Sequence, residues 1–293
     1  MTGQSLMPPP WLAHPRIPFG SIGWRMGDGE SYLWRWHDWF EALPDDPRNH
    51  YRELFPAPLT WPWFYEPVDE DGETQREDED DYCLLGLDGE CLVAHWQRHG
   101  RPRYNRRQLL AAPPEDFVFF WKPDPGVIGP ACLGQWQPSQ FWWPTGAYSC
   151  AEQYMMAEKS RLFGDKDVAA QIMAADDPKQ MKALGRQAKG FDGRLWDKAK
   201  HSIVLNGNYA KFAQNPGLRD YLLSTGDAVL VEASPLDAIW GIGLGETNPK
   251  AHDPGQWRGQ NLLGFALMEV RHEIRRVWGN SGLLDWTTIQ PTR

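Results

Sequence analysis

Residues 149–159 read Ser-Cys-Ala-Glu-Gln-Tyr-Met-Met-Ala-Glu-Lys, and this stretch decides the fold of the second half of the chain. It predicts a helix from Ser149 to about Phe163. Because a helix returns to the same face after seven residues, Glu152 and Lys159 project alike, about 10 Å apart along the axis. A carboxylate and an amine that face one pocket can do acid–base or nucleophilic work. Two alternatives stay open: Ser-x-x-Glu is also a capping box, in which Glu152 bonds back to the Ser149 amide, and Lys159 could be a surface lysine.

Helices and short strands are expected around this stretch. A buried strand is predicted at Phe117–Trp121 and a second strand at Ala228–Ala233. Prolines in a first turn, closing glycines and apolar periodicity predict four further helices. Their expected bounds are 178–190, 194–212, 216–226 and 261–277. The second half is therefore predicted to be mainly α with a few short strands.

The first half of the chain gives weaker signals. It is rich in Trp and Pro, with a helical candidate at Ser31–Leu43 and a β-hairpin candidate at Cys83–Arg98. A linker is expected at Ala111–Pro114. The predicted organisation is an acidic N-terminal region of uncertain fold (1–115), a catalytic domain (116–277) and a C-terminal tail (278–293).

Composition indicates a folded protein, since 41% of the residues are hydrophobic and 13% are aromatic. The 17 tryptophans favour core packing first and stacking on planar bases second. Residues 1–115 carry eleven Arg, no Lys and twenty Asp plus Glu, so the net charge of −9 lies entirely there. A chain with this distribution of charge lacks the broad basic surface of a protein that binds duplex nucleic acid through its phosphates. A local basic groove in the neutral second half remains an alternative.

Several classes of protein are disfavoured by what the sequence lacks. It has no run of eighteen apolar residues and no signal-peptide pattern at its start, so no membrane span is expected. The four cysteines are scattered, which is typical of reduced thiols in the cytoplasm. Neither cysteines nor histidines show metal-ligand spacing, so no metal and no cofactor is predicted.

Two later stretches add candidate binding residues. In 237–245, Asp237 precedes Trp240 and Gly241, which suits a sugar-hydroxyl contact beside a stacking platform. The alternative is an N-cap followed by a packed indole. In 257–264, Asn261 could cap the final helix or present its amide to a ligand.

These stretches together resemble the NADAR or YbiA-like superfamily over about residues 117–273. The resemblance rests on motifs that occur in the same order: 119–121 (Phe-Phe-Trp), 148–154 (Tyr-Ser-Cys-Ala-Glu-Gln-Tyr), Lys159, 184–186 (Leu-Gly-Arg), Phe191, 196–197 (Trp-Asp), 211–212 (Lys-Phe), 222–226 (Leu-Leu-Ser-Thr-Gly), 230–237 (Leu-Val-Glu-Ala-Ser-Pro-x-Asp), 240–243 (Trp-Gly-x-Gly) and 257–264 (Trp-x-Gly-x-Asn-Leu-Leu-Gly). Many members carry Ser-Asn-Phe where this chain has Gly-Gln-Trp at 134–136, and this departure leaves the substrate open.

The resemblance implies a compact, mostly helical domain that hydrolyses N-glycosidic bonds. Members cleave the early phosphoribosylamino-pyrimidine intermediates of riboflavin synthesis, and others remove ADP-ribose from guanine. The family's acidic residue corresponds to Glu152, its downstream lysine to Lys159, and its Asp-x-x-Trp-Gly motif to Asp237 and Trp240. We expect these four side chains to converge on one pocket.

The predicted roles follow from the chemistry of leaving ribose C1, which needs a proton for the base or support for oxocarbenium charge. Glu152 is the predicted acid/base, Lys159 a nucleophile or electrostatic partner, and Asp237 the residue that orients the ribose. Arg186 either holds a phosphate or forms a structural ion pair. The other predicted substrate-binding residues are Gln135, Trp136, Trp196, Trp240, Gly241 and Asn261.

Three functions remain in view. The first is an N-glycosidase for phosphoribosylamino-pyrimidines, and the second is a hydrolase of ADP-ribosylated guanine, free or in nucleic acid. The third is a non-catalytic reader of ADP-ribose or nucleotides. The expected partner is a small ribosyl or ADP-ribosyl substrate, and the N-terminal region is a candidate for binding a protein.

Overall fold

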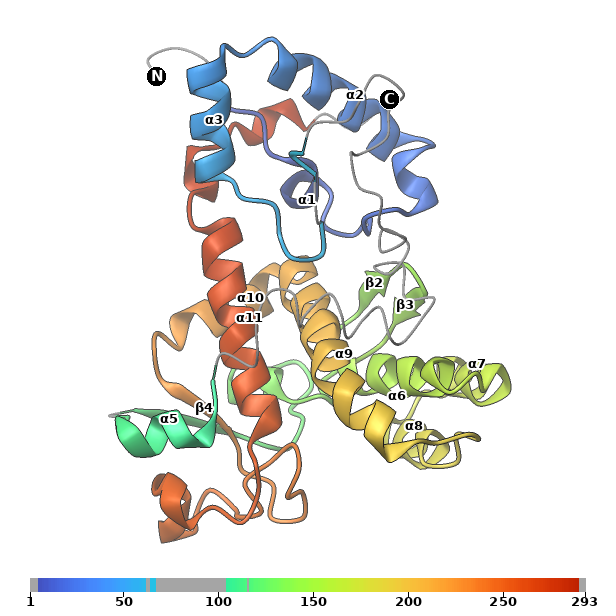
Figure 1. Ribbon diagram of the computed structural model, residues 1–293, viewed down its shortest axis with the longest axis vertical. Coiled ribbons are helices and arrows are strands. Elements are labelled where there is room, and N and C mark those ends of the chain that lie inside the picture. Colours follow the sequence, from blue (N-terminus) through green and yellow to red (C-terminus); the bar gives the residue numbers. More distant parts are fainter. Residues whose placement is uncertain (1–4, 62–63, 67–103, 115, 290–293) are drawn as a thin grey trace.

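The computed structural model describes residues 5–61, 64–66, 104–114 and 116–289. Helices dominate the described chain, and Figure 1 shows their arrangement. The α-helices are α1 (Pro10–Ala13), α2 (Asp28–Glu41), α3 (Asp45–Leu54), α5 (Arg106–Ala111), α6 (Ala151–Leu162), α7 (Lys166–Ala174), α8 (Pro178–Gly185), α9 (Gly193–Gln214), α10 (Pro216–Ser224) and α11 (Leu262–Trp278). Short 3₁₀ turns lie at Ile22–Trp24, Pro130–Leu133, Pro249–His252, Pro254–Gln256, Ser281–Leu283 and Trp286–Thr288.

Within the described residues, four short strands form two separate pairs. β1 (Phe117–Phe120) runs parallel to β4 (Val229–Glu232), with Phe120 opposite Glu232. β2 (Phe141–Trp143) and β3 (Gly146–Tyr148) form an antiparallel hairpin that leads directly into α6. The parallel pair therefore brings segments more than one hundred residues apart to one edge, where both strands end.

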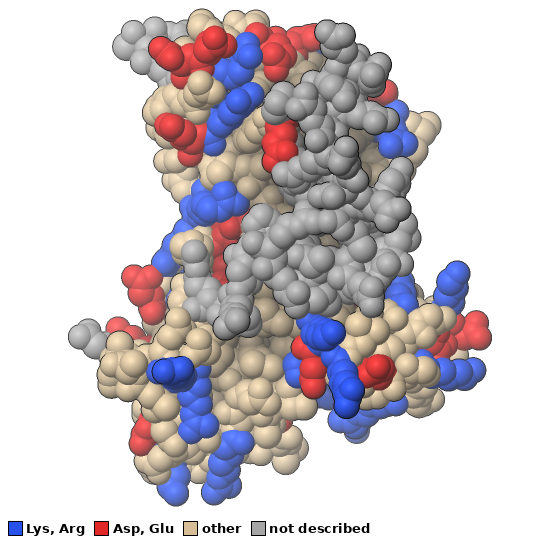
Figure 2. Space-filling model, viewed as in Figure 1, with Lys and Arg blue, Asp and Glu red and all other residues tan. Residues whose placement is uncertain are grey.

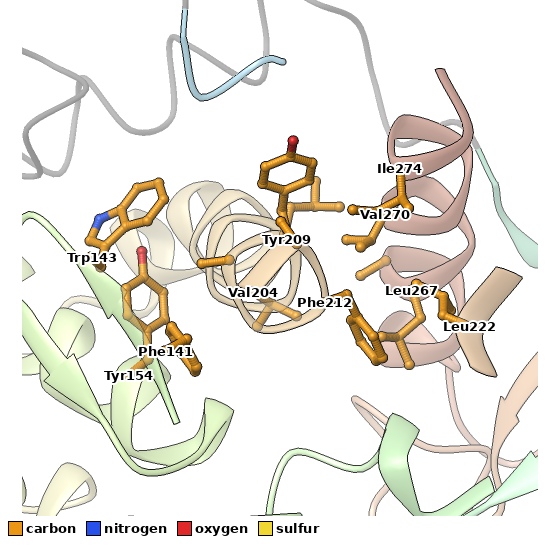
Figure 3. Close-up of a cluster of buried hydrophobic side chains, with 14 of the residues drawn as sticks. Phe141, Trp143, Tyr154, Val204, Tyr209, Phe212, Leu222, Leu267, Val270 and Ile274 are labelled. Atoms are coloured by element: carbon orange, nitrogen blue, oxygen red, sulfur yellow. The ribbon is translucent and has the colours of Figure 1, made fainter. Parts of the chain in front are cut away.

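The core is built around α9, which is buried along most of its second half. Figure 3 shows this helix between two groups of apolar side chains. Aromatic residues from β2 and α6 lie on one side, and aliphatic residues from α10 and α11 lie on the other. The labelled members are Phe141, Trp143, Tyr154, Val204, Tyr209, Phe212, Leu222, Leu267, Val270 and Ile274. A helix enclosed from both sides in this way fixes the positions of α6 and α11 relative to each other.

The N-terminal helices α1 to α3 gather at one end of the molecule, where the C-terminal end of α11 also lies (Figure 1). Arg276 of α11 donates to the backbone carbonyl of Ala57 at 2.7 Å, and Glu273 accepts from the backbone N–H of Leu59 at 2.8 Å. Buried side chains of residues 5–61 join the core of the second half in one continuous cluster. The division into domains at residue 115 stays a prediction.

Most helices predicted from the sequence are present with similar bounds, which confirms the mainly helical class. The helix expected at 178–190 ends earlier, at Gly185, where a Cβ would come within 2.3 Å of Met156 Sδ in α6. The buried strand predicted at Phe117–Trp121 ends at Phe120, which is its one buried residue, and Trp121 is 39% exposed. Helix α7 was not predicted.

The hairpin expected at 83–98 lies outside the described residues. Among the helices that the structure describes, none combines the length and apolar character needed to cross a bilayer. The cytoplasmic location stays a prediction. Basic and acidic side chains are interspersed on the face shown in Figure 2, with many of both signs over α7 and α8.

Candidate active site

The start of α6 decides whether Glu152 caps its helix or is free for chemistry. The backbone N–H of Ser149 donates to Gln153 Oε1 at 2.7 Å, and Ser149 Oγ donates to the same oxygen at 3.1 Å. Gln153 Nε2 in turn donates to the carbonyl of Ile172 in α7 at 3.1 Å. Gln153 therefore fills the capping role one position later than the sequence suggested. The capping alternative for Glu152 is wrong, and its carboxyl points elsewhere.

The Glu152 carboxyl is buried and short of hydrogen-bond donors. The residue is 2% exposed, and its Oε1 has no hydrogen-bond partner among the described residues. Burial raises the pKa of Glu152 to about 7, while the charge of Lys182 and a hydrogen bond from the Trp136 side chain act in the opposite direction. A carboxyl with a pKa near neutrality can both give and take a proton at physiological pH.

Asp237 reaches the same cluster from the loop that follows β4. Its Oδ1 accepts from the backbone N–H groups of Ile239 at 2.9 Å and Trp240 at 2.8 Å, which shapes the turn. Its Oδ2 lies 3.7 Å from Lys182 Nζ, and that ammonium is 6.0 Å from the centroid of the Trp136 ring. The charge of Asp237 also raises the pKa of Glu152, so the two predicted acids do share one electrostatic environment.

Glu232, the last residue of β4, is a third carboxyl that the sequence analysis did not assign to the site. Its Oε2 is buried and has no hydrogen-bond partner among the described residues. Burial raises the pKa of Glu232 to about 8; the charges of Asp237 and Glu152 raise it further, and Lys182 opposes them. The sequence signal for it is weak, because a carboxyl at the end of a predicted strand, in the same 230–237 stretch as Asp237, is one polar residue among many.

Lys159 lies against aromatic rings. Its Nζ is 4.6 Å from the ring centroid of Phe191 and 5.5 Å from that of Trp196. Burial lowers the pKa of Lys159, and the positive charge of Arg186 lowers it further. Arg186 also acts on Glu152, so this exposed guanidinium links the two halves of the predicted catalytic pair. That these side chains line a single cavity stays a prediction.

The loop that carries Gln135 and Trp136 is fixed by a buried lysine. Lys211, fully buried in α9, donates to the carbonyl of Gly134 at 2.9 Å. The side-chain Oε1 of Gln135 accepts from Asn208 Nδ2 at 3.1 Å, and its backbone carbonyl accepts from the N–H of Glu152 at 3.0 Å. Gln135 thus connects the loop to α6 and α9, and its side chain is engaged within the protein.

Asn261 and Gly241 support the backbone near Glu232. Asn261 Oδ1 accepts from the backbone N–H of Glu232 at 3.0 Å, and its Nδ2 donates to the carbonyl of Leu230 at 2.9 Å. Its side chain makes no capping bond to α11, so the capping alternative for Asn261 is not observed. A Cβ at position 241 would lie 2.8 Å from the Glu232 carbonyl and 3.0 Å from that of Asp237. Both residues allow close packing behind the carboxyls, and their role in substrate binding stays a prediction.

The structure therefore joins Glu152, Trp136, Arg186 and Asp237 through charge or hydrogen bonding. Trp240, which is half-buried, is tied to them through the turn at Asp237. Lys182, Glu232 and Phe191 are the neighbours that the sequence analysis left out of the site. Within the described ranges, no group of three or more His, Cys, Asp or Glu side chains is arranged to hold a metal ion. The expected independence of metals stays a prediction.

A mainly helical fold that buries a protonatable carboxyl beside lysine and arginine defines an acid–base site of hydrolytic type. Residues 119–275 match the family model of the NADAR domain. N-glycosidase R617 of Acanthamoeba polyphaga mimivirus is 42% identical over 164 residues, which cover 54% of this chain and 96% of that protein. The chain therefore belongs to the NADAR family.

The same comparisons bear on activity. The viral relative is an N-glycosidase by name, and this chain is a hydrolase of that class, which cleaves N-glycosyl bonds. The chloroplastic riboflavin biosynthesis protein PYRR of Zea mays is 33% identical over 141 residues, covering 46% of this chain and 20% of that protein. The NMR structure of the Escherichia coli protein YbiA is similar with a TM-score of 0.45 and 25% identity, over 55% of this chain and 85% of that chain.

Proposed function

We propose that this N-glycosidase cleaves the bond between C1 of a phosphorylated ribose and the nitrogen of a base, with phosphoribosylamino-pyrimidines as its preferred substrates. The observation that carries the proposal is the Glu152 carboxyl, buried without a partner for Oε1 and with its pKa raised to about 7. The choice of substrate is supported by the likeness to a protein named for riboflavin biosynthesis.

In the proposed reaction, Glu152 protonates the departing nitrogen while the C1–N bond breaks. Because burial raises its pKa to about 7, a substantial share of this carboxyl carries a proton at neutral pH. Asp237, held by the backbone N–H groups of the turn and by Lys182, is oriented to accept a hydrogen bond from a ribose hydroxyl. Arg186 is exposed beside Glu152 and offers a guanidinium fork to a phosphate.

Lys159 can act in two ways. Its lowered pKa increases the share of neutral amine, which could attack C1 and hold the sugar as a Schiff base. Alternatively the ammonium, held between Phe191 and Trp196, acts through its charge. Borohydride reduction during turnover separates these routes, because it traps a sugar adduct on Lys159 in the first and leaves the lysine unmodified in the second.

The test of the proposed function is a product assay with two substrates. We expect release of ribose 5-phosphate from the phosphoribosylamino-pyrimidines and slower release of ADP-ribose from ADP-ribosylated guanosine. Preference for the guanine adduct would replace the substrate that we propose. Tight binding of ADP-ribose with neither substrate cleaved would favour a non-catalytic reader.

A further inference from the structure

Lys182 and Asp237 form an ion pair that is partly open to solvent. Lys182 Nζ, in α8, lies 3.7 Å from Asp237 Oδ2, in the loop after β4. This separation is longer than the roughly 3 Å of a direct hydrogen bond. The two side chains are 34% and 21% exposed. Because a loose and partly exposed ion pair adds little stability, a small polar group can enter between its members at low cost.

Separate parts of the fold hold the two members of this pair. Asp237 Oδ1 accepts from two backbone N–H groups of its own turn, at 2.9 and 2.8 Å, and Oδ2 is the oxygen that faces Lys182. Lys182 is carried by α8, which packs closely on α6 at Gly185, where a Cβ would come within 2.3 Å of Met156 Sδ. An acceptor and a charged donor are therefore in place on either side of one gap before a ligand arrives.

The chemistry of this gap suits a hydroxyl group. A hydroxyl is both a donor and an acceptor, so its O–H can donate to Asp237 Oδ2 while its oxygen accepts from Lys182 Nζ. A phosphate is repelled by the carboxylate of Asp237, and an ammonium group is repelled by that of Lys182. Among the groups on a phosphorylated ribose, a ring hydroxyl is the one that satisfies both sides.

The gap is linked to the carboxyl that acts at ribose C1. Lys182 Nζ is 6.0 Å from the centroid of the Trp136 ring, and the Trp136 side chain hydrogen-bonds Glu152. The ribose hydroxyl nearest to C1 is the one on C2, and hydrogen bonds to a 2-hydroxyl strengthen in the transition state of glycoside hydrolysis. Arg186, four residues after Lys182 and one helical turn away, stays free for the phosphate at the other end of the sugar.

We propose that Lys182 and Asp237 bind the 2-hydroxyl of the ribose between them, and that Lys182 thereby makes the site specific for ribosyl over 2-deoxyribosyl substrates. This inference rests on the proposed function and adds the sugar hydroxyl that is recognised and a specificity-determining residue. In a 2-deoxy sugar, a methylene group takes the place of the hydroxyl and forms neither hydrogen bond.

The first test measures binding without turnover. The probes are methyl ribofuranoside 5-phosphate and its 2-deoxy analogue, which carry no base to release, titrated by calorimetry into the full chain. The wild type should bind the ribose probe about 100-fold more tightly, or about tenfold for each hydrogen bond to a charged group. Lys182→Met keeps much of the side-chain length and removes the donor, so this preference should fall about tenfold.

Two variants serve as controls for Lys182→Met. Lys179→Met removes an exposed lysine of the same helix and should leave the preference unchanged. Lys182→Arg keeps a charged donor and should keep most of the preference. A wild type that binds both probes equally, or neither at millimolar concentration, overturns the inference. So does a Lys182→Met variant that weakens both probes by the same factor, because a purely structural or long-range electrostatic role does not depend on the 2-hydroxyl.

Asp237→Asn replaces Lys182→Met if that variant does not fold. Asparagine keeps Oδ1 as the acceptor for the turn and puts an amide donor in place of Oδ2. The preference for the ribose probe should again fall about tenfold, and an unchanged preference overturns the inference.

The second test compares kcat/KM for the phosphoribosylamino-pyrimidines and their 2-deoxyribosyl analogues. Lys182→Met should lower kcat/KM for the ribosyl substrate about tenfold more than for the deoxyribosyl one, and equal losses overturn the inference. The two proposals fail separately. A wild type that discriminates between the probes but cleaves no ribosylated substrate refutes the proposed function and leaves the 2-hydroxyl site standing. Cleavage without discrimination refutes the 2-hydroxyl site alone.

Discussion

Replacement of Glu152 by glutamine should increase stability relative to the wild type as the pH rises, while it lowers turnover. Glutamine keeps the shape of the side chain and is neutral at every pH, so it resembles the protonated acid. In the folded chain, burial raises the pKa of Glu152 to about 7 from an ordinary value of 4.5. A raised pKa means that this carboxyl favours folding most below pH 4.5, and that the benefit is lost as the pH rises through 7.

The size of the effect follows from that shift. A difference of one pKa unit corresponds to about 1.4 kcal/mol, so the change from 4.5 to about 7 corresponds to about 3 kcal/mol. In the mutant, the side chain at position 152 does not titrate, so it adds no pH dependence to the free energy of unfolding. Relative to the wild type, Glu152→Gln should therefore gain up to about 3 kcal/mol of unfolding free energy between pH 4.5 and pH 8.5. Turnover should fall by about 10²–10⁴-fold, because glutamine does not transfer a proton.

Urea unfolding at pH 4.5, 5.5, 7 and 8.5, followed by tryptophan fluorescence, measures the stability difference. Product release at the pH of maximal activity measures the rate. The matched control is Glu246→Gln, which removes an exposed carboxyl. If Glu152→Gln is destabilised equally at all four pH values, the fold does not raise the pKa of this carboxyl. If it also keeps a near wild-type rate, its assignment as proton donor is refuted.

Three further outcomes are expected. Gly207→Ala should lower the free energy of unfolding, measured with urea, by about 1–3 kcal/mol, because the new Cβ would lie 2.4 Å from Tyr154 Cδ1. Unchanged stability would mean that α9 and α6 do not pack this closely. Arg276→Ala should speed proteolysis of residues 5–61, because it removes the 2.7 Å bond to the Ala57 carbonyl and the ion pair to Glu273; an unchanged cleavage rate would show that this contact does not anchor the N-terminal part. Activity should persist in a chelator, and a loss that zinc or magnesium restores would contradict metal-independent hydrolysis.

The helices were predictable where local signals act alone. Proline in the first turn places the starts of α8 and α10 correctly, because it cannot continue a preceding helix and its lost N–H costs nothing there. The end of α8 was placed too late at Gly190; the helix ends at Gly185, which packs closely against Met156 of α6. Helix α7 was missed although Asp165 accepts from the backbone N–H of Val168, a cap that the sequence does contain.

The parallel pairing of β1 and β4 could not be derived in the same way. Each strand has four residues, and their pairing spans more than one hundred positions, so no local pattern specifies the partner. This pairing nevertheless places Glu232 at the same edge as the loop that carries Asp237. The omission of Glu232 from the predicted site follows directly: without the pairing, a glutamate at a strand end is one polar residue among many.

The seven-residue spacing of Glu152 and Lys159 on one helix predicts only part of the surroundings of Glu152. Seven residues return to the same face, and Arg186 does act on both side chains, but the ammonium whose charge acts most strongly on Glu152 is Lys182 of α8. Its position depends on the docking of α8 against α6.

The capping box was misassigned by one residue, and in a helix one residue turns the side chain by about 100°. Because Gln153 takes the Ser149 amide, Glu152 is rotated away from the helix end and into the interior. Burial raises the pKa of this carboxyl to about 7, the range that proton transfer at neutral pH requires, and its Oε1 has no hydrogen-bond donor among the described residues.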